Sequence, residues 1–350
     1  MTQLTIEYLL ESAIRAEASD IHLSVNKPPI FRVHGEMAAV SLPPLTAEDL
    51  NHLILKILNE YQKEAFARTK ELDFSYRFIK DYQCRVNLCY EKGNVCATIR
   101  IISSRMKTIA ELGLPSVIDE LVKKREGLII LSGTAGSGKS TTFNYLINQI
   151  NINHKCKIIT IEDPIEYFHD SKKSLIIQRE VGVDTKSFAS ALKYSLRQDP
   201  DVVAIGEMRD LESISMAMTT AETGHLVITT VHAPDAIETI NRIIDVYPVG
   251  QKDQICTQLA ENLAAVICQK LVSSKDSAER ILATEVLMAT LPIRNIIRRQ
   301  ALVELRGQMD ASTSHGMHSF EKCLSDLVKK GLVSPETAKE NVKNIHSLEI

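Results

Sequence analysis

One segment near the middle of the chain has the composition of a phosphate-binding loop. It reads Gly133-Thr134-Ala135-Gly136-Ser137-Gly138-Lys139-Ser140, which fits G-x-x-x-x-G-K-[ST]. Glycines let backbone amides converge on phosphate oxygens, and the positive end of the helix expected after the loop points at the same place. The ammonium of Lys139 is expected to contact the β- and γ-phosphates, and the hydroxyl of Ser140 to bind Mg²⁺. With Thr141 as a further contact, the pattern predicts a nucleoside triphosphate site.

Acidic residues follow the next apolar run of the sequence, which is a predicted strand. Glu162 and Asp163 come directly after it, and Glu166 lies three residues further on. Ligands of parallel sheets bind at the carboxyl ends of the strands, so these acids are expected to face the Mg²⁺ ion and the γ-phosphate. Any one of them is a candidate general base for the attacking water. Surface turn acids are the alternative, but the nearby phosphate loop favours the catalytic interpretation.

Two further apolar runs end in residues that could act on the γ-phosphate. The run at 202–205 is followed by Gly206 and Glu207, whereas the usual Walker B aspartate is missing. Glu207 is expected to hold Mg²⁺ through a water molecule or to polarise the lytic water, and the sequence leaves both roles open. His232 ends the next run and is expected to sense the γ-phosphate. His225 begins that run and is a second candidate for nucleotide binding, with a purely structural histidine as the alternative for both.

The patterns around these residues predict two domains joined by a linker. Residues 1–104 alternate between helical and strand-like patterns, including a hairpin turn at 91–94, and predict a small α+β domain. Polar residues and helix breakers at 105–118 predict a linker. Residues 119–350 contain nearly continuous apolar runs between helical patterns, which is typical of a parallel sheet covered on both faces. These predicted strands lie at 127–131, 157–161, 202–205 and 226–230, and the tail from about 252 is expected to be helical.

Composition narrows the class of protein. The 350 residues carry 41 basic and 44 acidic side chains, a net charge of −3, and no basic field that would suggest a nucleic-acid partner. The seven cysteines form no Cys-x-x-Cys pair, so reduced core thiols are expected. Neither a signal peptide nor an apolar run long enough for a membrane span is evident. The sequence therefore predicts a cytoplasmic protein.

The four motifs, in this order and at these spacings, resemble the secretion ATPases of type II and type IV pilus systems. In that family they are named Walker A, Asp box, Walker B and His box. The resemblance extends to segments near both ends of the chain, which are most similar to the pilus-retraction branch: 18–23, 32–37, 293–298 and 316–320. It implies an α/β fold, a RecA-like P-loop ATPase domain with a smaller N-terminal α+β (PAS-like) domain, assembled as a homohexamer.

The resemblance also implies catalytic residues outside the ATPase domain. Arg85 and Arg100 match N-terminal-domain arginines that are expected to reach the phosphates, although ordinary sheet-surface arginines are the alternative. Lys92 falls at a third basic position, where the retraction branch usually carries arginine. Lysine keeps the charge but lacks the planar guanidinium. The family further implies an inner-membrane pilus platform protein and a paralogous retraction ATPase as partners, and a location at the inner face of the inner membrane.

The combined interpretation is a hexameric motor that hydrolyses ATP with Mg²⁺ and powers type IV pilus retraction and twitching motility. Related alternatives are an accessory retraction ATPase and a secretion or assembly ATPase of the same superfamily. Two alternatives belong to other classes, a RecA-type nucleic-acid motor and a nucleotide-gated adaptor without turnover.

Overall fold

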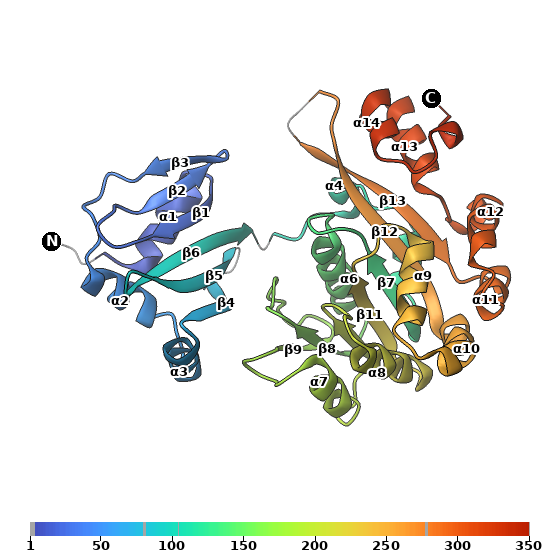
Figure 1. Cartoon of the computed structure of the whole chain (residues 1–350), viewed down its shortest axis with the longest axis horizontal. Helices are drawn as coiled ribbons and strands as arrows, with labels where there is room; N and C mark the ends of the chain where they lie inside the picture. Colours follow the sequence, from blue (N-terminus) through green and yellow to red (C-terminus); the bar gives the residue numbers. More distant parts are fainter. Residues whose placement is uncertain (1–3, 80–81, 104, 277–278, 350) are drawn as a thin grey trace. The chain divides into compact units, whose positions relative to one another are not determined.

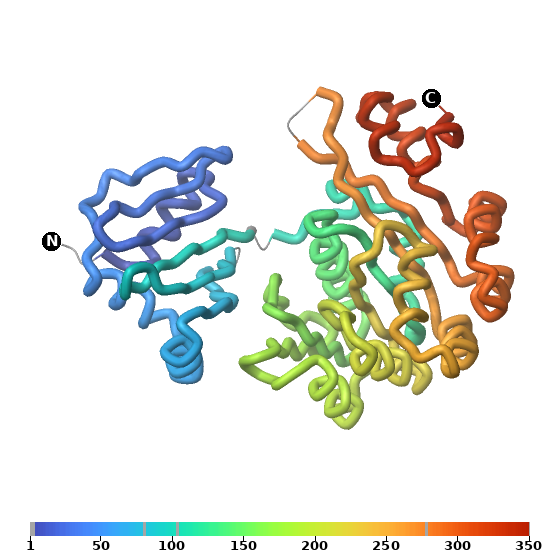
Figure 2. Tube along the Cα trace, viewed as in Figure 1, coloured from blue at the N-terminus to red at the C-terminus, as the bar shows by residue number. Residues whose placement is uncertain are grey.

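The computed structural model describes residues 4–79, 82–103, 105–276 and 279–349. Contacts along the chain divide it into two compact units (Figures 1 and 2). The first unit comprises Met1–Met106 together with Asp163–Phe168 and Glu180–Asp184. The second comprises Lys107–Glu162, His169–Arg179 and Thr185–Ile350.

The first unit is built on a six-stranded antiparallel sheet in the order β3-β2-β1-β6-β5-β4. Its strands are β1 Ala18–Leu23, β2 Ile30–Val33, β3 Glu36–Ala39, β4 Glu71–Ile79, β5 Tyr82–Glu91 and β6 Asn94–Ser103. Its helices are α1 Ile6–Arg15, α2 Ala47–Leu55 and α3 Glu60–Thr69. The order of one helix, three strands, two helices and three strands around an antiparallel sheet agrees with the α+β prediction.

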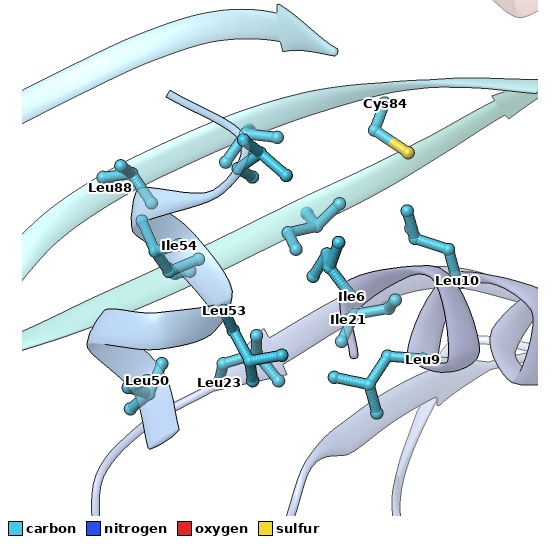
Figure 3. Packing of buried hydrophobic residues seen from close by; sticks show 14 of the residues in the cluster. Ile6, Leu9, Leu10, Ile21, Leu23, Leu50, Leu53, Ile54, Cys84 and Leu88 are labelled. Atoms are coloured by element: carbon cyan, nitrogen blue, oxygen red, sulfur yellow. The ribbon is translucent and has the colours of Figure 1, made fainter. Parts of the chain in front are cut away.

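One face of this sheet carries the hydrophobic core of the first unit. Ile6, Leu9 and Leu10 of α1 and Leu50, Leu53 and Ile54 of α2 are all buried against it (Figure 3). Along β5, Cys84, Val86 and Leu88 are buried, whereas Arg85 and Asn87 are exposed. Because neighbouring side chains of a strand point to opposite faces, β5 presents its polar residues on the face away from the core.

The second unit contains a seven-stranded sheet in the order β13-β12-β7-β11-β10-β8-β9. Strands β12, β7, β11, β10 and β8 pair in parallel, and β13 pairs antiparallel with β12. The strands are β7 Gly127–Ser132, β8 Lys157–Glu162, β9 Leu175–Glu180, β10 Val202–Ile205, β11 Leu226–Val231, β12 Leu263–Ser273 and β13 Arg280–Met288. All four predicted strands are present, so the parallel α/β prediction is confirmed.

Helices surround this second sheet, and two of them occupy the predicted linker. Helix α4 lies wholly within 105–118 and α5 begins there, and both belong to the second unit. The helices are α4 Ile109–Leu112, α5 Val117–Val122, α6 Lys139–Asn153, α7 Phe188–Ser195, α8 Leu211–Glu222, α9 Ala236–Asp245, α10 Lys252–Asn262, α11 Leu291–Arg298, α12 Leu305–Asp310, α13 Phe320–Lys329 and α14 Pro335–Glu340. Among the described residues, none of the helices is long and apolar enough to cross a membrane.

Candidate functional site

The phosphate loop connects the end of β7 to the start of α6. Gly133, Gly136 and Gly138 have φ angles of +146°, +74° and +92°, which glycine adopts without strain. A Cβ atom on Gly133 would lie 2.5 Å from the carbonyl oxygen of Gln269 and 2.5 Å from Oγ of Ser137. The sequence therefore needs glycine at 133 both for the backbone conformation and for space.

Lys139 is the first residue of α6, and its side chain folds over the loop. Nζ donates hydrogen bonds to the carbonyl oxygens of Gly133 and Thr134, each at 2.8 Å, and Lys139 is only 7% exposed. The buried Oγ of Ser137 has no hydrogen-bond partner in the described part of the chain. A buried ammonium, the amino end of a 15-residue helix and an unpartnered hydroxyl in one loop fit the oxygen atoms of a bound phosphate group.

The ends of three strands lie along the same edge of the sheet as the phosphate loop. The sheet order puts β11 next to β7, followed by β10 and β8. His232 follows β11, Glu207 follows β10 and Glu162 ends β8. A Cβ atom on Gly206 would be 3.4 Å from Cα of Glu162, and Oγ1 of Thr230 donates to the carbonyl of Gly206 at 2.6 Å. The strand-end residues are therefore aligned by direct contacts.

Glu207 and His232 form the polar centre of this edge. The Glu207 side chain is 12% exposed; Oε1 is paired with Arg209, and Oε2 lies 3.7 Å from Nε2 of His232. Burial lowers the pKa of His232, and the positive charge of Lys139 lowers it further, while Glu207 acts in the opposite direction. His232 is therefore neutral at pH 7. Because the charge of Lys139 affects His232, the phosphate loop and the end of β11 are close enough to interact electrostatically.

Glu162 is buried and held in a fixed orientation. Its Oε1 accepts hydrogen bonds from Oγ1 of Thr160 at 2.7 Å and from Nε2 of Gln178 at 3.2 Å. Sequence reasoning grouped Glu162 with Asp163 and Glu166, but the structure separates them. Glu162 belongs to the second unit, whereas Asp163 and Glu166 belong to the first.

His225 lies at the amino end of β11, and its surroundings differ from those expected. Its Nδ1 is 3.0 Å from Oγ1 of Thr223 and 3.1 Å from the carbonyl oxygen of Thr220. Its own carbonyl accepts a hydrogen bond from the amide of Gly127, the first residue of β7. The phosphate loop begins at the other end of β7, roughly 20 Å away for a strand of this length. The structure therefore places His225 away from the phosphate loop, at the carboxyl end of α8, which it caps.

A cavity next to the phosphate loop was missed by sequence reasoning. It has a volume of about 630 Å³ and lies within the second unit. Gln269 of β12 lines it and donates from Nε2 to Oγ1 of Thr142 at 2.7 Å, while its buried Oε1 has no partner in the described residues. The β12–β13 pair that forms one wall carries no sequence motif. The other lining residues include Lys107, Glu111, Leu112, Gly138, Thr141 and Leu282.

The predicted arginines form a separate cluster on the polar face of the first unit. Arg85 and Arg100 are directly opposite each other on β5 and β6. Nε of Arg100 donates to Oδ1 of Asp20 at 2.9 Å, and Oγ of Ser19 donates to Oδ2 of Asp20 at 2.8 Å. Burial raises the pKa of Asp20, but the hydrogen bonds from Ser19 and Arg100 outweigh it and leave the pKa below its usual value. Asp20 is therefore a fixed anion that orients Arg100.

Residues 163–168 complete this cluster. Oγ of Ser75 donates to the carbonyl of Ile165, and the amide of Phe168 donates to Oε1 of Gln83 at 3.0 Å. A cavity of about 150 Å³ results, and Glu166 lines it together with Arg85 and Arg100. The guanidinium of Arg85 has no protein partner in the described ranges. Sequence reasoning named all three residues but did not predict that they lie around one cavity.

Lys92 stands apart from this cluster. It lies in the turn between β5 and β6, with φ of +51°. Its side chain is 87% exposed, and Nζ is 3.6 Å from Oε1 of Glu91. The register of the hairpin puts it seven residues along β5 from Arg85, so it is not part of the arginine pair.

Comparisons with known proteins agree over nearly the whole chain. Residues 2–325 match the family model of type II/IV secretion system proteins. The chain is 40% identical to the type IV pilus retraction ATPase PilT of Pseudomonas aeruginosa over 340 residues, 97% of this chain and 98% of that protein. It is 39% identical to the twitching motility protein of Neisseria gonorrhoeae over 320 residues, 91% of this chain and 86% of that protein. The type IV pilus ATPase PilU of Pseudomonas aeruginosa is 35% identical over 347 residues, 99% of this chain and 91% of that protein.

Solved structures give the same result. A crystal structure of the pilus retraction motor PilT with bound ADP aligns with a TM-score of 0.91 and 40% identity, covering 99% of each chain. The ATPase DotB of Legionella pneumophila aligns with a TM-score of 0.84 and 26% identity, covering 97% of this chain and 96% of that one.

Proposed function

The chain belongs to the family of type II/IV secretion system proteins, and from this premise we propose that it is the ATP-hydrolysing motor of type IV pilus retraction. The observation that carries the proposal is that Lys139, Glu207 and His232 lie at the same edge of the sheet. The chain as a whole is similar to PilT. The phosphate loop alone would support only nucleotide binding. The near full-length similarity to retraction ATPases supports the finer assignment.

In this function, the loop amides and Lys139 bind the β- and γ-phosphates. The hydroxyl of Ser140 and the carboxylate of Glu207 are the residues that would hold Mg²⁺, Glu207 through a water molecule. One or two protein oxygens suffice, because Mg²⁺ in nucleotide sites takes its remaining ligands from phosphates and water. When bound, the ion neutralises charge on the phosphate oxygens. The nucleoside would occupy the 630 Å³ cavity between α6 and β12.

The acids have distinct roles in our proposal. Glu207 orients the attacking water, and neutral His232 beside it contacts the γ-phosphate. Glu162 keeps the carboxyl end of β8 in place through its bonds to Thr160 and Gln178. Glu166 stays a candidate for the catalytic base together with these two acids.

Arg85 and Arg100 would act as arginine fingers on the developing γ-phosphate charge. Asp20 occupies Nε of Arg100 and leaves the terminal nitrogens of that guanidinium for phosphate. The assembly that we propose is a homohexamer in the cytoplasm, docked on an inner-membrane platform protein of the pilus machine. A paralogous retraction ATPase is a further proposed partner.

The test is pilus imaging in a deletion strain of the source organism. We expect excess pili that do not retract and loss of twitching, restored by the wild-type gene but not by Lys139→Ala. Cells without pili would instead indicate an assembly motor. In the purified protein, stimulation of ATP hydrolysis by single-stranded DNA would contradict the proposal in favour of a nucleic-acid motor.

A further inference from the structure

Two cysteines of the first unit face each other across the β5–β6 hairpin. Cys89 of β5 is the direct partner of Cys96 of β6 in the antiparallel register, three residues before and after the turn formed by Lys92 and Gly93. Both side chains are partly exposed, and Cys89 is close enough to raise the pKa of Cys96. They lie close together although seven positions separate them in the sequence.

The geometry of such a pair matches that of a disulfide bond. Directly opposite residues of antiparallel strands have Cα atoms about 4.5–5.5 Å apart. Disulfide-bonded cysteines have Cα atoms about 4.4–6.8 Å apart. The Cα separation expected for this pair therefore falls within the range found for disulfide-bonded cysteines.

The remaining cysteine of the first unit does not compete for this bond. Cys84 lies on the same strand as Cys89 but on the opposite face, where it is buried in the core (Figure 3). Burial raises its pKa to about 12, which keeps the thiol protonated. The four other cysteines belong to the second unit.

We propose that Cys89 and Cys96 form a modification site at which a peroxide oxidises the two thiols to a reversible cross-strand disulfide bond. The first sulfur attacks hydrogen peroxide, the O–O bond breaks, and a sulfenic acid and one water result. The second thiol then attacks that sulfur, the S–O bond breaks, and the S–S bond forms with release of a second water. Overall, two thiols lose two protons and two electrons, and the peroxide is reduced to two water molecules.

The bond would act on the part of the sheet that bears the arginine cluster. Cys89 and Cys96 lie on the same face as Arg85 and Arg100, four residues away along the same two strands. A covalent link restrains the twist of these strands relative to each other. Because the pair is partly exposed, the bond is accessible to thiol reductants, and accessible bonds are generally the labile, regulatory ones.

The rate at which the Cys89–Cys96 disulfide forms should depend on pH. Burial and the adjacent Cys89 sulfur both raise the pKa of Cys96. The thiolate is the nucleophile in each step, so the bond should form faster as the pH rises above neutrality.

The test uses the full-length protein and hydrogen peroxide, followed by alkylation of free thiols under denaturing conditions and tryptic peptide mapping. Trypsin cleaves after Arg85, Lys92 and Arg100, so the bond would join two separate peptides, 86–92 and 93–100. We expect this linked pair in protein that runs as a monomer on a non-reducing gel, and its disappearance after treatment with dithiothreitol. Cys89→Ser should abolish the linked pair.

A matched control is Cys156→Ser, which removes another partly exposed thiol and should leave the linked peptides unchanged. The melting temperature of Cys89→Ser should equal that of the wild type, so that loss of the link does not reflect unfolding. Alkylation of both Cys89 and Cys96 after peroxide treatment would overturn the proposal. Irreversible oxidation of the two cysteines separately, or a link to any other cysteine, would overturn it equally.

Discussion

Lys139 contacts the carbonyl groups of its own loop, so its charge is held where phosphates would bind. Removing the ammonium should leave a loop that still folds but no longer neutralises the β- and γ-phosphates. We therefore expect Lys139→Ala to reduce ATP turnover to background in a phosphate-release assay. Lys155→Ala is the control, because Lys155 is exposed in the loop before β8, at the opposite edge of the sheet, and its loss should not change turnover. Residual turnover within tenfold of wild type would contradict the assignment.

Arg85 should matter for hydrolysis rather than for binding. Its guanidinium is exposed beside Glu166 and Arg100 and is available for a negatively charged ligand. Because an arginine finger contributes about 10³–10⁵ in rate, we expect Arg85→Ala to lower kcat by at least about 10³-fold. The dissociation constant for a fluorescent ATP analogue should change less than about threefold. Arg68→Ala on α3 is the matched surface control, and an unchanged kcat in Arg85→Ala would remove Arg85 from the site.

At the residue scale, prediction succeeds where one local pattern fixes both backbone and chemistry. The glycines and Lys139 could be predicted because the loop needs them in one short segment. Glu207 and His232 followed from the rule that strand ends meet at one edge. His225 lies away from the phosphate loop because it begins the strand that His232 follows, and residue type does not say which end of a strand faces a ligand. The Cys89–Cys96 pair depends on the register of the hairpin at 91–94, which is set by the turn and not by the spacing of the cysteines.

The turn from β7 into α6 holds the phosphate loop, and a substitution of Gly133 tests it. Alanine at this position would bring a methyl group to 2.5 Å from the carbonyl oxygen of Gln269 at a φ of +146°. We expect Gly133→Ala to abolish ATP binding in isothermal titration and to lower the melting temperature. Gly136→Ala should do less, because nothing lies within 4 Å of a Cβ there, although its φ of +74° still carries strain. Equal effects of the two substitutions would contradict the steric argument.

The segment 293–298, which is similar to the pilus-retraction branch of the family, contains an arginine with a structural role. Arg294 of α11 donates to the carbonyl groups of Ala260, Glu261 and Leu263, at the carboxyl end of α10. The last carbonyls of a helix lack partners of their own. This arginine therefore caps a neighbouring helix.

Arg294→Ala should accordingly destabilise the protein. Loss of charge-assisted bonds of this kind costs about 1.5–3 kcal/mol, which corresponds to a decrease in melting temperature of roughly 3–12 °C for a domain of this size. Differential scanning fluorimetry measures this decrease in melting temperature. Arg298→Ala is the control, since Arg298 makes only surface contacts, a hydrogen bond from Nη1 to Oδ1 of Asn295 at 3.0 Å and an approach to Glu261 at 4.0 Å. A melting temperature within 1–2 °C of wild type for Arg294→Ala would contradict the capping role.

Strand prediction succeeded for four of the buried parallel strands and failed for β12 and for the two strands at the edges of the sheet. Four strands appear as apolar runs bounded by polar residues. Strand β12 was missed because it follows α10 without a glycine or proline, so its apolar residues extend a helical pattern. Strands β9 and β13 mix polar and apolar residues at the edges of the sheet. The β12–β13 wall of the cavity beside the phosphate loop was missed for the same reason.

For the molecule as a whole, His169 makes stability depend on pH. Burial lowers the pKa of His169 to about 4, and its Nε2 lies 2.9 Å from Oδ1 of Asn144 on α6. An unfolded histidine titrates near 6.5, so between pH 6.5 and about 4 the unfolded chain binds a proton that the folded chain does not. Stability is therefore fully present above pH 6.5 and decreases as the pH falls toward 4.

Because of His169, the free energy of unfolding should be about 2 kcal/mol lower at pH 5 than at pH 7. Urea unfolding of the wild type and of His169→Gln at both pH values measures it. Glutamine keeps an amide donor for Asn144 but does not titrate, so the variant should lose less stability between pH 7 and pH 5. The same pH dependence in both proteins would show that other groups cause it.

The division of the chain into units has a consequence for how chemical energy could become movement. The backbone passes from one unit to the other after residues 106, 162, 168, 179 and 184. One of these crossings falls directly after Glu162, the buried acid at the end of β8. The peptide that leaves Glu162 therefore leads straight into residues 163–168 of the first unit. The strand end that bears Glu162 and the unit that carries Arg85 and Arg100 are thus joined directly through the peptide backbone.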